Sequence, residues 1–180
     1  MRLTPTSIPG AWIVDIEPHW DERGLFARTF GVEEFTAFGL SAVVAQCSTS
    51  FNPTPGTLRG LHFQAAPYAE ARLVRCTRGA VYDVAVDLRV ESATFLKWVS
   101  LELTADNRRM LYIPEGCAHG FMTLCADTEV YYQISAPYRA DATSGVRWDD
   151  PAFGVEWPLR PSVLSDRDAQ YPDFRVVSPG

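Results

Sequence analysis

AVYDVAVDLR at residues 80–89 alternates apolar and polar side chains, so that four apolar residues share one face of an extended chain while Asp83 and Asp87 share the other. This alternation predicts a β-strand. Runs bounded by Gly, Pro, Asp or Asn predict further strands at residues 11–16, 25–30, 57–63, 72–76, 97–103, 110–113, 120–124 and 129–135. Only residues 32–38 favour a helix, and the tail from Pro158 is expected to wrap irregularly over the sheets. Many short strands with little helix predict an all-β sandwich or barrel.

Composition limits the classes of function. A chain of 180 residues fits one domain, residues 1–180, and 47% hydrophobic with 21% charged residues is typical of a soluble globular protein. The net charge of -6 disfavours a nucleic-acid partner, and no apolar stretch is long enough for a membrane span, so we expect a cytoplasmic location. The four cysteines, Cys47, Cys76, Cys117 and Cys125, show no CxxC spacing and are interpreted as buried reduced thiols.

Three histidines are the candidates for acid-base chemistry near neutral pH. His19 is expected in a surface turn without a role in the site. His62 lies in LRGLHFQ (58–64), where alternation places Gly60, His62 and Gln64 on one face and Arg59 on the other, and the small Gly60 leaves space for a ligand. His119 lies in PEGCAHGF (114–121), expected to be a loop leading into a strand, where a structural and a binding role are about equally expected.

Two other kinds of site are disfavoured. Small barrels that bind a metal often carry His-x-His, but His62 is followed by Phe63 and Gln64, so we expect no metal. Asp83 and Asp87 could form the paired carboxylates of a hydrolase, yet we interpret them as ordinary acids on a solvated strand face.

Six ordered motifs, taken together, resemble the dTDP-4-dehydrorhamnose 3,5-epimerase family; they are DERG (21–24), GTLRGLHFQ (56–64), LVRCTRG (73–79), DVAVDLR (83–89), PEGCAHGF (114–121) and LSDRD (164–168). The resemblance spans nearly the whole chain. It implies a double-stranded β-helix jelly roll, a cupin-like barrel with minor helical and irregular peripheral segments. It also implies a homodimer with shared strands, a nucleotide-linked 4-keto-deoxysugar as substrate, and no cofactor.

The resemblance assigns roles by position. His62 resembles the catalytic base, Asp168 the carboxylate that orients it, and Tyr132 the acid on the opposite face of the sugar ring. Tyr131 would then point away from the site. Arg72 takes the place of a lysine that stabilises the enolate. The residues expected to bind the nucleotide or the sugar are Arg23, Phe26, Arg28, Gln46, Arg59, His119, Tyr138 and Arg167.

The family pattern is broken at three positions. Arg72 replaces a lysine, which keeps the positive charge but exchanges a compact ammonium for a planar guanidinium. Arg28 and Thr143 stand where glutamates are expected. The nucleotide is therefore open among thymidine, cytidine, guanosine and uridine.

The activity expected is epimerisation at carbon 5, carbon 3 or both, because a ketone at carbon 4 acidifies both neighbouring C–H bonds. The alternatives are a 3,4-ketoisomerase and a non-catalytic binding protein. The presence of His62, Asp168 and Tyr132 together disfavours the binding protein.

Overall fold

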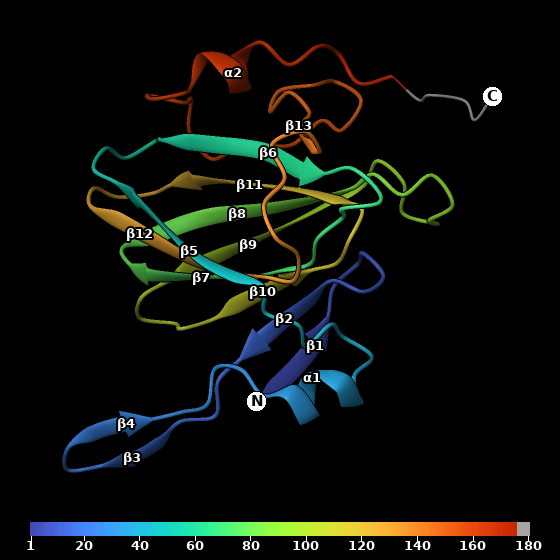
Figure 1. Cartoon of the computed structure of the whole chain (residues 1–180). Helices are drawn as coiled ribbons and strands as arrows, with labels where there is room; N and C mark the ends of the chain where they lie inside the picture. Colours follow the sequence, from blue (N-terminus) through green and yellow to red (C-terminus); the bar gives the residue numbers. More distant parts are fainter. Residues whose placement is uncertain (176–180) are drawn as a thin grey trace.

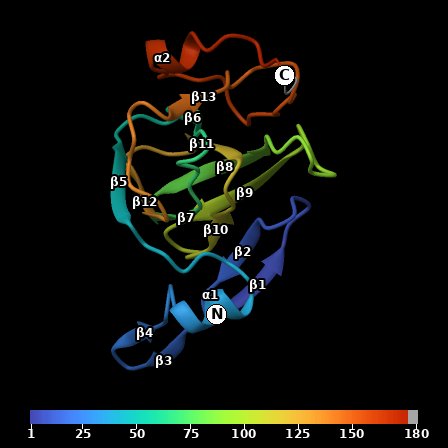
Figure 2. The same cartoon turned by 45° about the vertical axis from the view of Figure 1, so that its right-hand side comes forward.

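Two antiparallel sheets face each other in the computed structural model, which describes residues 1–175 (Figures 1 and 2). The six-stranded sheet has the order β1 (Arg2–Pro5), β2 (Trp12–Asp15), β10 (Met110–Ile113), β7 (Arg72–Arg78), β12 (Thr128–Ile134), β5 (Gln46–Asn52). The five-stranded sheet has the order β13 (Thr143–Gly145), β6 (Leu58–Gln64), β11 (Cys117–Thr123), β8 (Ala80–Asp87), β9 (Trp98–Thr104). From β5 to β8 and from β9 to β13, successive strands alternate between the two sheets. This alternation is the double-stranded β-helix that the resemblance implies, and the all-β prediction is confirmed.

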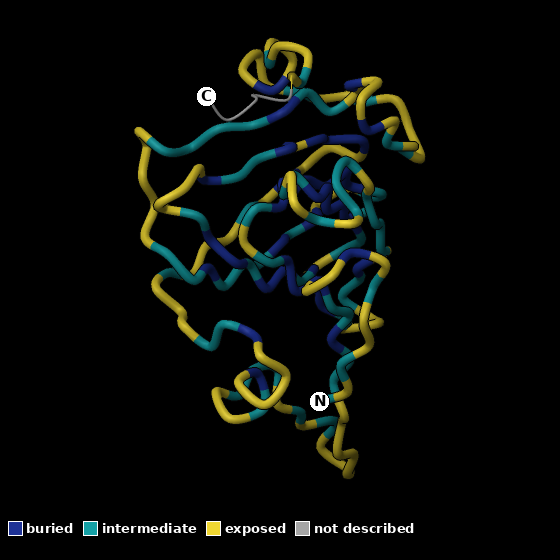
Figure 3. Tube along the Cα trace, turned by 90° about the vertical axis from the view of Figure 1, so that its right-hand side faces the viewer, coloured by how far each residue is buried: buried dark blue, intermediate teal, exposed yellow. Residues whose placement is uncertain are grey.

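The main core lies between the sheets. Val74, Leu111 and Val130 of the six-stranded sheet meet Ala85 and Phe121 of the five-stranded sheet, and all five are buried. Burying an aliphatic or aromatic side chain of this kind contributes about 1.5–3 kcal/mol. Figure 3 shows buried residues along the strands and exposed ones on the loops around them. The two sheets are therefore held together by a continuous buried core.

A second core forms outside the barrel, where α1 (Val32–Ala37) lies near β1 and β2 (Figure 1). Its Phe35 is fully buried, with its ring 5.9 Å from that of Tyr112. The helix predicted at residues 32–38 is confirmed. The helix packs the segment that precedes β5 against the outer side of the six-stranded sheet.

The hairpin of β3 (His19–Asp21) and β4 (Gly24–Phe26) stands away from the barrel, and its strands pair only with each other among the described residues (Figure 1). His19 is exposed as expected but belongs to a strand, so its placement in a turn was wrong. The strand predicted at residues 25–30 ends at Phe26, because the chain leaves the hairpin there to reach α1.

Several boundaries differ from the sequence prediction. β1, β3, β5 and β13 were not predicted, and β11 begins at Cys117, so His119 lies inside a strand and not in a loop. The tail contains a short helix, α2 (Asp166–Ala169), and runs beside β6, with Val163 bridged to Thr57 (Figure 1). Its last part, residues 176–180, lies outside the described residues.

The cysteines are all free, but only Cys76 and Cys117 are buried; Cys125 is partly buried, and Cys47 is exposed on edge strand β5, which corrects the prediction of four buried thiols. Helices within residues 1–175 are all too short to cross a membrane.

Candidate active site

The open end of the barrel holds a cavity of about 460 Å³ lined by both sheets. His62, His119, Arg59 and Phe121 line it from the five-stranded sheet. The six-stranded sheet and the loop after β12 contribute Ser48, Thr49, Ser50, Arg72, Tyr132, Ile134 and Tyr138. A cavity lined by arginine and histidine side chains and several hydroxyls suits a polar, anionic ligand in an otherwise acidic protein.

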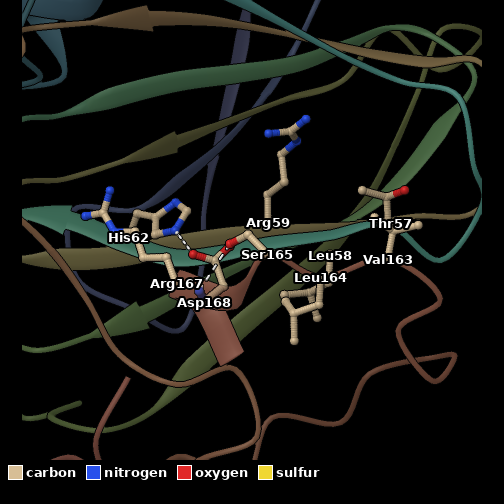
Figure 4. A pocket seen from close by; sticks show the side chains of 9 residues that line it. All are labelled: Thr57, Leu58, Arg59, His62, Val163, Leu164, Ser165, Arg167 and Asp168. Carbon is tan, nitrogen blue, oxygen red and sulfur yellow. Dashed lines mark hydrogen bonds and ion pairs between the residues drawn. The ribbon is translucent and has the colours of Figure 1, made fainter. Parts of the chain in front are cut away.

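His62 is paired with a carboxylate from the tail. Its Nε2 lies 2.7 Å from Oδ1 of Asp168 in α2, and Asp168 is only 4% exposed (Figure 4). The second oxygen, Oδ2, accepts the backbone N–H of Gly60 at 3.1 Å, and Ser165 caps the helix by accepting the N–H of Asp168. Because both carboxylate oxygens are occupied, Asp168 fixes one orientation of the His62 ring, with the proton on Nε2 and the lone pair on Nδ1.

Asp168 stays ionised in this setting. Burial alone would raise its pKa, but the hydrogen bond and charge of His62, with the N–H of Gly60 and the hydroxyl of Ser165, bring the pKa below its ordinary value. The imidazole of His62 therefore lies beside a stable anion, which is the arrangement that favours a general base.

β6 is irregular just before His62. Gly60 has φ +131°, and the pairing with β11 shifts register between His119 and Phe121. Arg59 and His62 consequently line the same cavity, so the prediction that they face opposite sides was wrong. The space at Gly60 is also not open to a ligand, since a Cβ there would lie 2.5 Å from Cα of Gly120. Gly60 is needed for close approach of two strands, not for ligand volume.

His119 has its own carboxylate partner, which the sequence analysis misassigned. Its Nε2 lies 2.8 Å from Oδ1 of Asp83, which is fully buried. Asp87 is fully buried as well, and accepts hydrogen bonds from Arg89, Ser92 and Thr94. Neither acid lies on a solvated face. This face of β8 is covered at both positions, and alternation alone could not distinguish a buried polar face from an exposed one.

Arg72 lies at the start of β7, and its side chain contacts three residues. Its Nη1 is 3.2 Å from the backbone oxygen of His62 and 3.4 Å from Nδ1 of His119. Its Nε donates to Oε1 of Glu70 at 2.9 Å. A guanidinium can only donate, so Nδ1 of His119 accepts from Arg72. The Nε2–H of His119 then donates to Asp83. Arg72 therefore brings a positive charge to this wall of the cavity.

Tyr132 reaches the cavity from β12, opposite His62. Its ring is 6.0 Å from that of His119 in an edge-to-face arrangement. Burial raises the pKa of the Tyr132 hydroxyl, and the charge of Asp83 raises it further against the opposing charges of Arg72 and Arg59. The hydroxyl therefore keeps its proton. Tyr131 points the other way, under the guanidinium of Arg75, as strand alternation predicts.

The expected binding residues around this cavity are partly brought together. Arg59 lines the cavity and donates from Nε to Oδ1 of Asn52 at 2.7 Å. Tyr138 lines its rim, and its backbone N–H donates to Oε1 of Gln46 at 3.2 Å, so Gln46 holds the rim loop. Arg167 lines an adjoining hollow of about 320 Å³ behind β6, which shares Arg59 and His62 with the main cavity (Figure 4).

Comparison with known proteins identifies the fold and its family. A sequence profile of the dTDP-4-dehydrorhamnose 3,5-epimerase family matches residues 5–175. The dTDP-4-dehydrorhamnose 3,5-epimerase of Sinorhizobium fredii is 48% identical over 155 residues, covering 86% of this chain and 80% of that protein. The chain belongs to the dTDP-4-dehydrorhamnose 3,5-epimerase family. As a member it is an isomerase, an epimerase of nucleotide-linked sugars.

Solved structures agree with this assignment. The crystal structure of the dTDP-4-dehydrorhamnose 3,5-epimerase from Elizabethkingia anophelis superposes with a TM-score of 0.94 at 34% identity, covering 97% of this chain and 96% of that one. The 3'-monoepimerase of Streptomyces bikiniensis, in complex with dTDP-quinovose, superposes with a TM-score of 0.86 at 35% identity, covering 94% and 86%. Proteins of this fold thus include both 3,5-epimerases and a 3'-monoepimerase.

Three expected binding residues of this family member lie on or just after the β3–β4 hairpin, away from both the cavity and the adjoining hollow. Arg23 sits in the turn of the β3–β4 hairpin, 84% exposed in its side chain and bonded to Asp21. Phe26 is 77% exposed on the same hairpin, and Arg28 follows it with an ion pair to Glu34. A single copy of this chain does not bring these three residues to His62.

Metal ligands do not gather in residues 1–175: no three His, Cys, Asp or Glu side chains are placed to hold an ion. His62 and His119 are neighbours across the β6–β11 pair, but each has a carboxylate on Nε2. That the enzyme needs no metal remains a prediction.

Sequence reasoning missed Asp83, Glu70 and Asn52, which hold His119, Arg72 and Arg59 in place. It also missed Ser48 and Ser50 as lining residues, although the nearby Gln46 was expected to bind substrate.

Proposed function

We propose that this chain inverts carbon 3, carbon 5 or both in a dTDP-linked 4-keto-6-deoxyhexose during deoxysugar biosynthesis. The observation that carries the proposal is the placement of His62 and Tyr132 on opposite sheets, facing one cavity. Inversion through a planar enolate requires proton removal on one face and proton delivery on the other. The names of the relatives, and the dTDP-quinovose bound to one of them, support thymidine as the nucleotide.

His62 is the proposed base. Asp168 keeps the proton on Nε2, so Nδ1 is free to take the proton from the carbon next to the ketone. The imidazolium that forms is stabilised by the Asp168 anion, which is held by Gly60 and does not itself need to move.

Tyr132 is the proposed acid, and Arg72 the proposed electrostatic partner of the enolate oxygen. The raised pKa of Tyr132 keeps the hydroxyl protonated until the carbanion forms. Arg72 places a fixed positive charge where negative charge develops, and such preorganised groups contribute strongly because they need no reorientation. Arg59, Tyr138, Gln46, His119 and Arg167 are proposed to hold the sugar nucleotide.

Proton NMR of the product in D₂O tests the activity. Incubation with dTDP-4-keto-6-deoxyglucose should give deuterium at carbon 3 or carbon 5 and a new set of ring couplings for the inverted centre. A shifted carbonyl without inversion would indicate a 3,4-ketoisomerase. Binding without exchange would indicate a non-catalytic protein. Parallel reactions with the cytidine, guanosine and uridine analogues test the nucleotide.

Two variants test the two-sided mechanism. His62→Ala should abolish exchange. Tyr132→Phe should keep exchange with retained configuration but lose inverted product by roughly 10²- to 10⁴-fold, the usual range for a general acid. Tyr131→Phe is the matched control, because its hydroxyl faces away from the cavity. Loss of turnover in Tyr131→Phe but not in Tyr132→Phe would reverse the assignment.

We also propose that the enzyme is a homodimer in which the β3–β4 hairpin of one subunit completes the site of the other. The hairpin stands off the barrel, and its Trp20 and Phe26 are 68% and 77% exposed (Figure 1). Large apolar side chains at such exposure are typical of surfaces that a partner covers. Arg23, Phe26 and Arg28 would then reach substrate in the second subunit.

Mixing two inactive variants tests this sharing. If Arg23 acts across the interface, Arg23→Ala and His62→Ala subunits should complement each other after refolding together. About a quarter of the sites should recover, because half of the dimers are mixed and each mixed dimer has one intact site. No recovery in a confirmed mixed dimer would place Arg23 in its own subunit's site or outside both.

A further inference from the structure

Glu70 is a buried acid that neither the motifs nor the proposed mechanism uses. It precedes β7 by two residues and is 8% exposed. Two residues further on, Arg72 lines the cavity with a side chain only 14% exposed. The acid lies just before the strand and pairs with the guanidinium of Arg72.

The contacts divide the guanidinium into two parts. Nε and Nη2 both donate to Oε1 of Glu70, at 2.9 Å and 2.5 Å. Nη1 is left for the cavity side, where it meets the backbone oxygen of His62 and Nδ1 of His119. A planar group held along one edge has its other edge fixed in direction.

We propose that Glu70 is a positioning residue that aims Arg72 at the reacting sugar and thereby allows arginine to serve at this position. The arginine side chain has several rotatable bonds, and its charge is spread over three nitrogens. Glu70 fixes which of them faces the ligand. The proposal rests on the proposed function for its kinetic consequence, but the contact itself can be tested without turnover.

A purely structural ion pair is the competing explanation. A buried pair commonly adds little net stability, because desolvation of both charges offsets their attraction. The Glu70–Arg72 pair instead fixes the orientation of the guanidinium. Without Glu70 the guanidinium would keep only its long contacts at Nη1. Removal of Glu70 should thus affect the rate of the chemical step more than substrate binding.

The kinetic test is a double-mutant cycle with Glu70→Ala, Arg72→Lys and both together. Glu70→Ala should lower kcat about tenfold in the presence of Arg72, with little change in KM, a coupling typical of residues in contact. In the Arg72→Lys background the same change should cost less than about threefold, since a compact ammonium has no fork to orient. Equal losses in both backgrounds would overturn the proposal.

Two variants keep this test interpretable. Glu70→Gln retains an accepting oxygen for Nε and Nη2, so it should remain closer to wild type in kcat than Glu70→Ala. Asp15→Ala is the matched control, because Asp15 of β2 accepts a hydrogen bond from Nε of Arg109 at 2.8 Å, and neither residue lines the cavity. It should change kcat by less than about twofold. A loss in Asp15→Ala as large as in Glu70→Ala would mean that the effect is general destabilisation.

Hydrogen exchange of the Arg72 Nε–H, followed by NMR, tests the contact between Glu70 and Arg72 separately from its effect on catalysis. In wild type this proton is held by Glu70 and should exchange slowly, and Glu70→Ala should speed its exchange at least tenfold, whereas Asp15→Ala should not. Unchanged exchange in Glu70→Ala would refute the positioning role whatever the activity. If exchange responds but the wild type does not epimerise any substrate, the positioning role holds and the proposed function fails.

Discussion

Asp168→Asn should disable the His62 base while changing almost no volume. The carboxylate accepts from two donors, Nε2–H of His62 through Oδ1 and N–H of Gly60 through Oδ2. An amide has only one oxygen, so it cannot satisfy both donors. If its oxygen faces His62, its NH₂ faces the N–H of Gly60, and two buried donors oppose each other at a cost of about 1–3 kcal/mol.

The other orientation fails chemically. If the amide oxygen faces Gly60, the NH₂ donates to Nε2 of His62, and the ring must carry its proton on Nδ1, the atom proposed to act as base. Both orientations also remove the anion that stabilises the imidazolium. A wrong tautomer in another histidine–aspartate pair costs about 10⁴ in kcat, and loss of a general base costs about 10² to 10⁴. We therefore expect kcat/KM to fall by at least about 10².

Deuterium exchange at carbons 3 and 5 of the sugar, followed by proton NMR, measures this loss. Asp150→Asn is the control, because Asp150 is 2% exposed and accepts the N–H of Ala152 and of Phe174, far from the reacting groups. It should lose stability but keep activity per folded molecule. If Asp168→Asn keeps more than about a tenth of wild-type activity, the orienting role of Asp168 is wrong.

Three further outcomes are expected. Prolonged chelation should leave activity unchanged, and activity restored only by added metal would contradict the proposed mechanism. Gly60→Ala should destabilise the fold by about 3 kcal/mol in urea titration, since its Cβ would meet Gly120 and its φ is positive; a neutral result would contradict the close approach. Asp87→Asn should cost about 3 kcal/mol at pH 7. Burial raises the pKa of Asp87, but hydrogen bonds led by that of Arg89 hold it well below the ordinary value. This stabilisation is present above the unfolded pKa of about 3.9 and is lost as the pH falls through the folded pKa, so the two proteins should converge in acid.

The barrel strands were predictable where one face of a strand is apolar. β8 and β10 are the clearest cases, and β10 has the predicted bounds. β5 was missed because Ser48, Thr49 and Ser50 line a polar cavity and the strand holds few apolar residues, so no apolar period exists. Strands that line a binding site lose the pattern by which strands are recognised.

Only the site residues that lie in or near the family motifs could be predicted from the sequence. His62, Asp168 and Tyr132 were named by resemblance, and the cavity brings His62 and Tyr132 together while α2 delivers Asp168. The buried partner of His119 was misassigned, because burial of Asp83 depends on what packs against β8 from far along the chain. Arg59 was placed on the wrong face because a register shift interrupts β6, and no local sequence rule locates that shift.

The position of Asp168 along the chain has a consequence for truncated chains. Every strand of both sheets lies before residue 146, whereas the carboxylate that orients His62 arrives some twenty residues later, on α2. A chain that ends between Gly145 and Ser165 contains every strand of both sheets but lacks the carboxylate that orients the base. We therefore expect such a chain to convert sugar nucleotide much more slowly than the full chain.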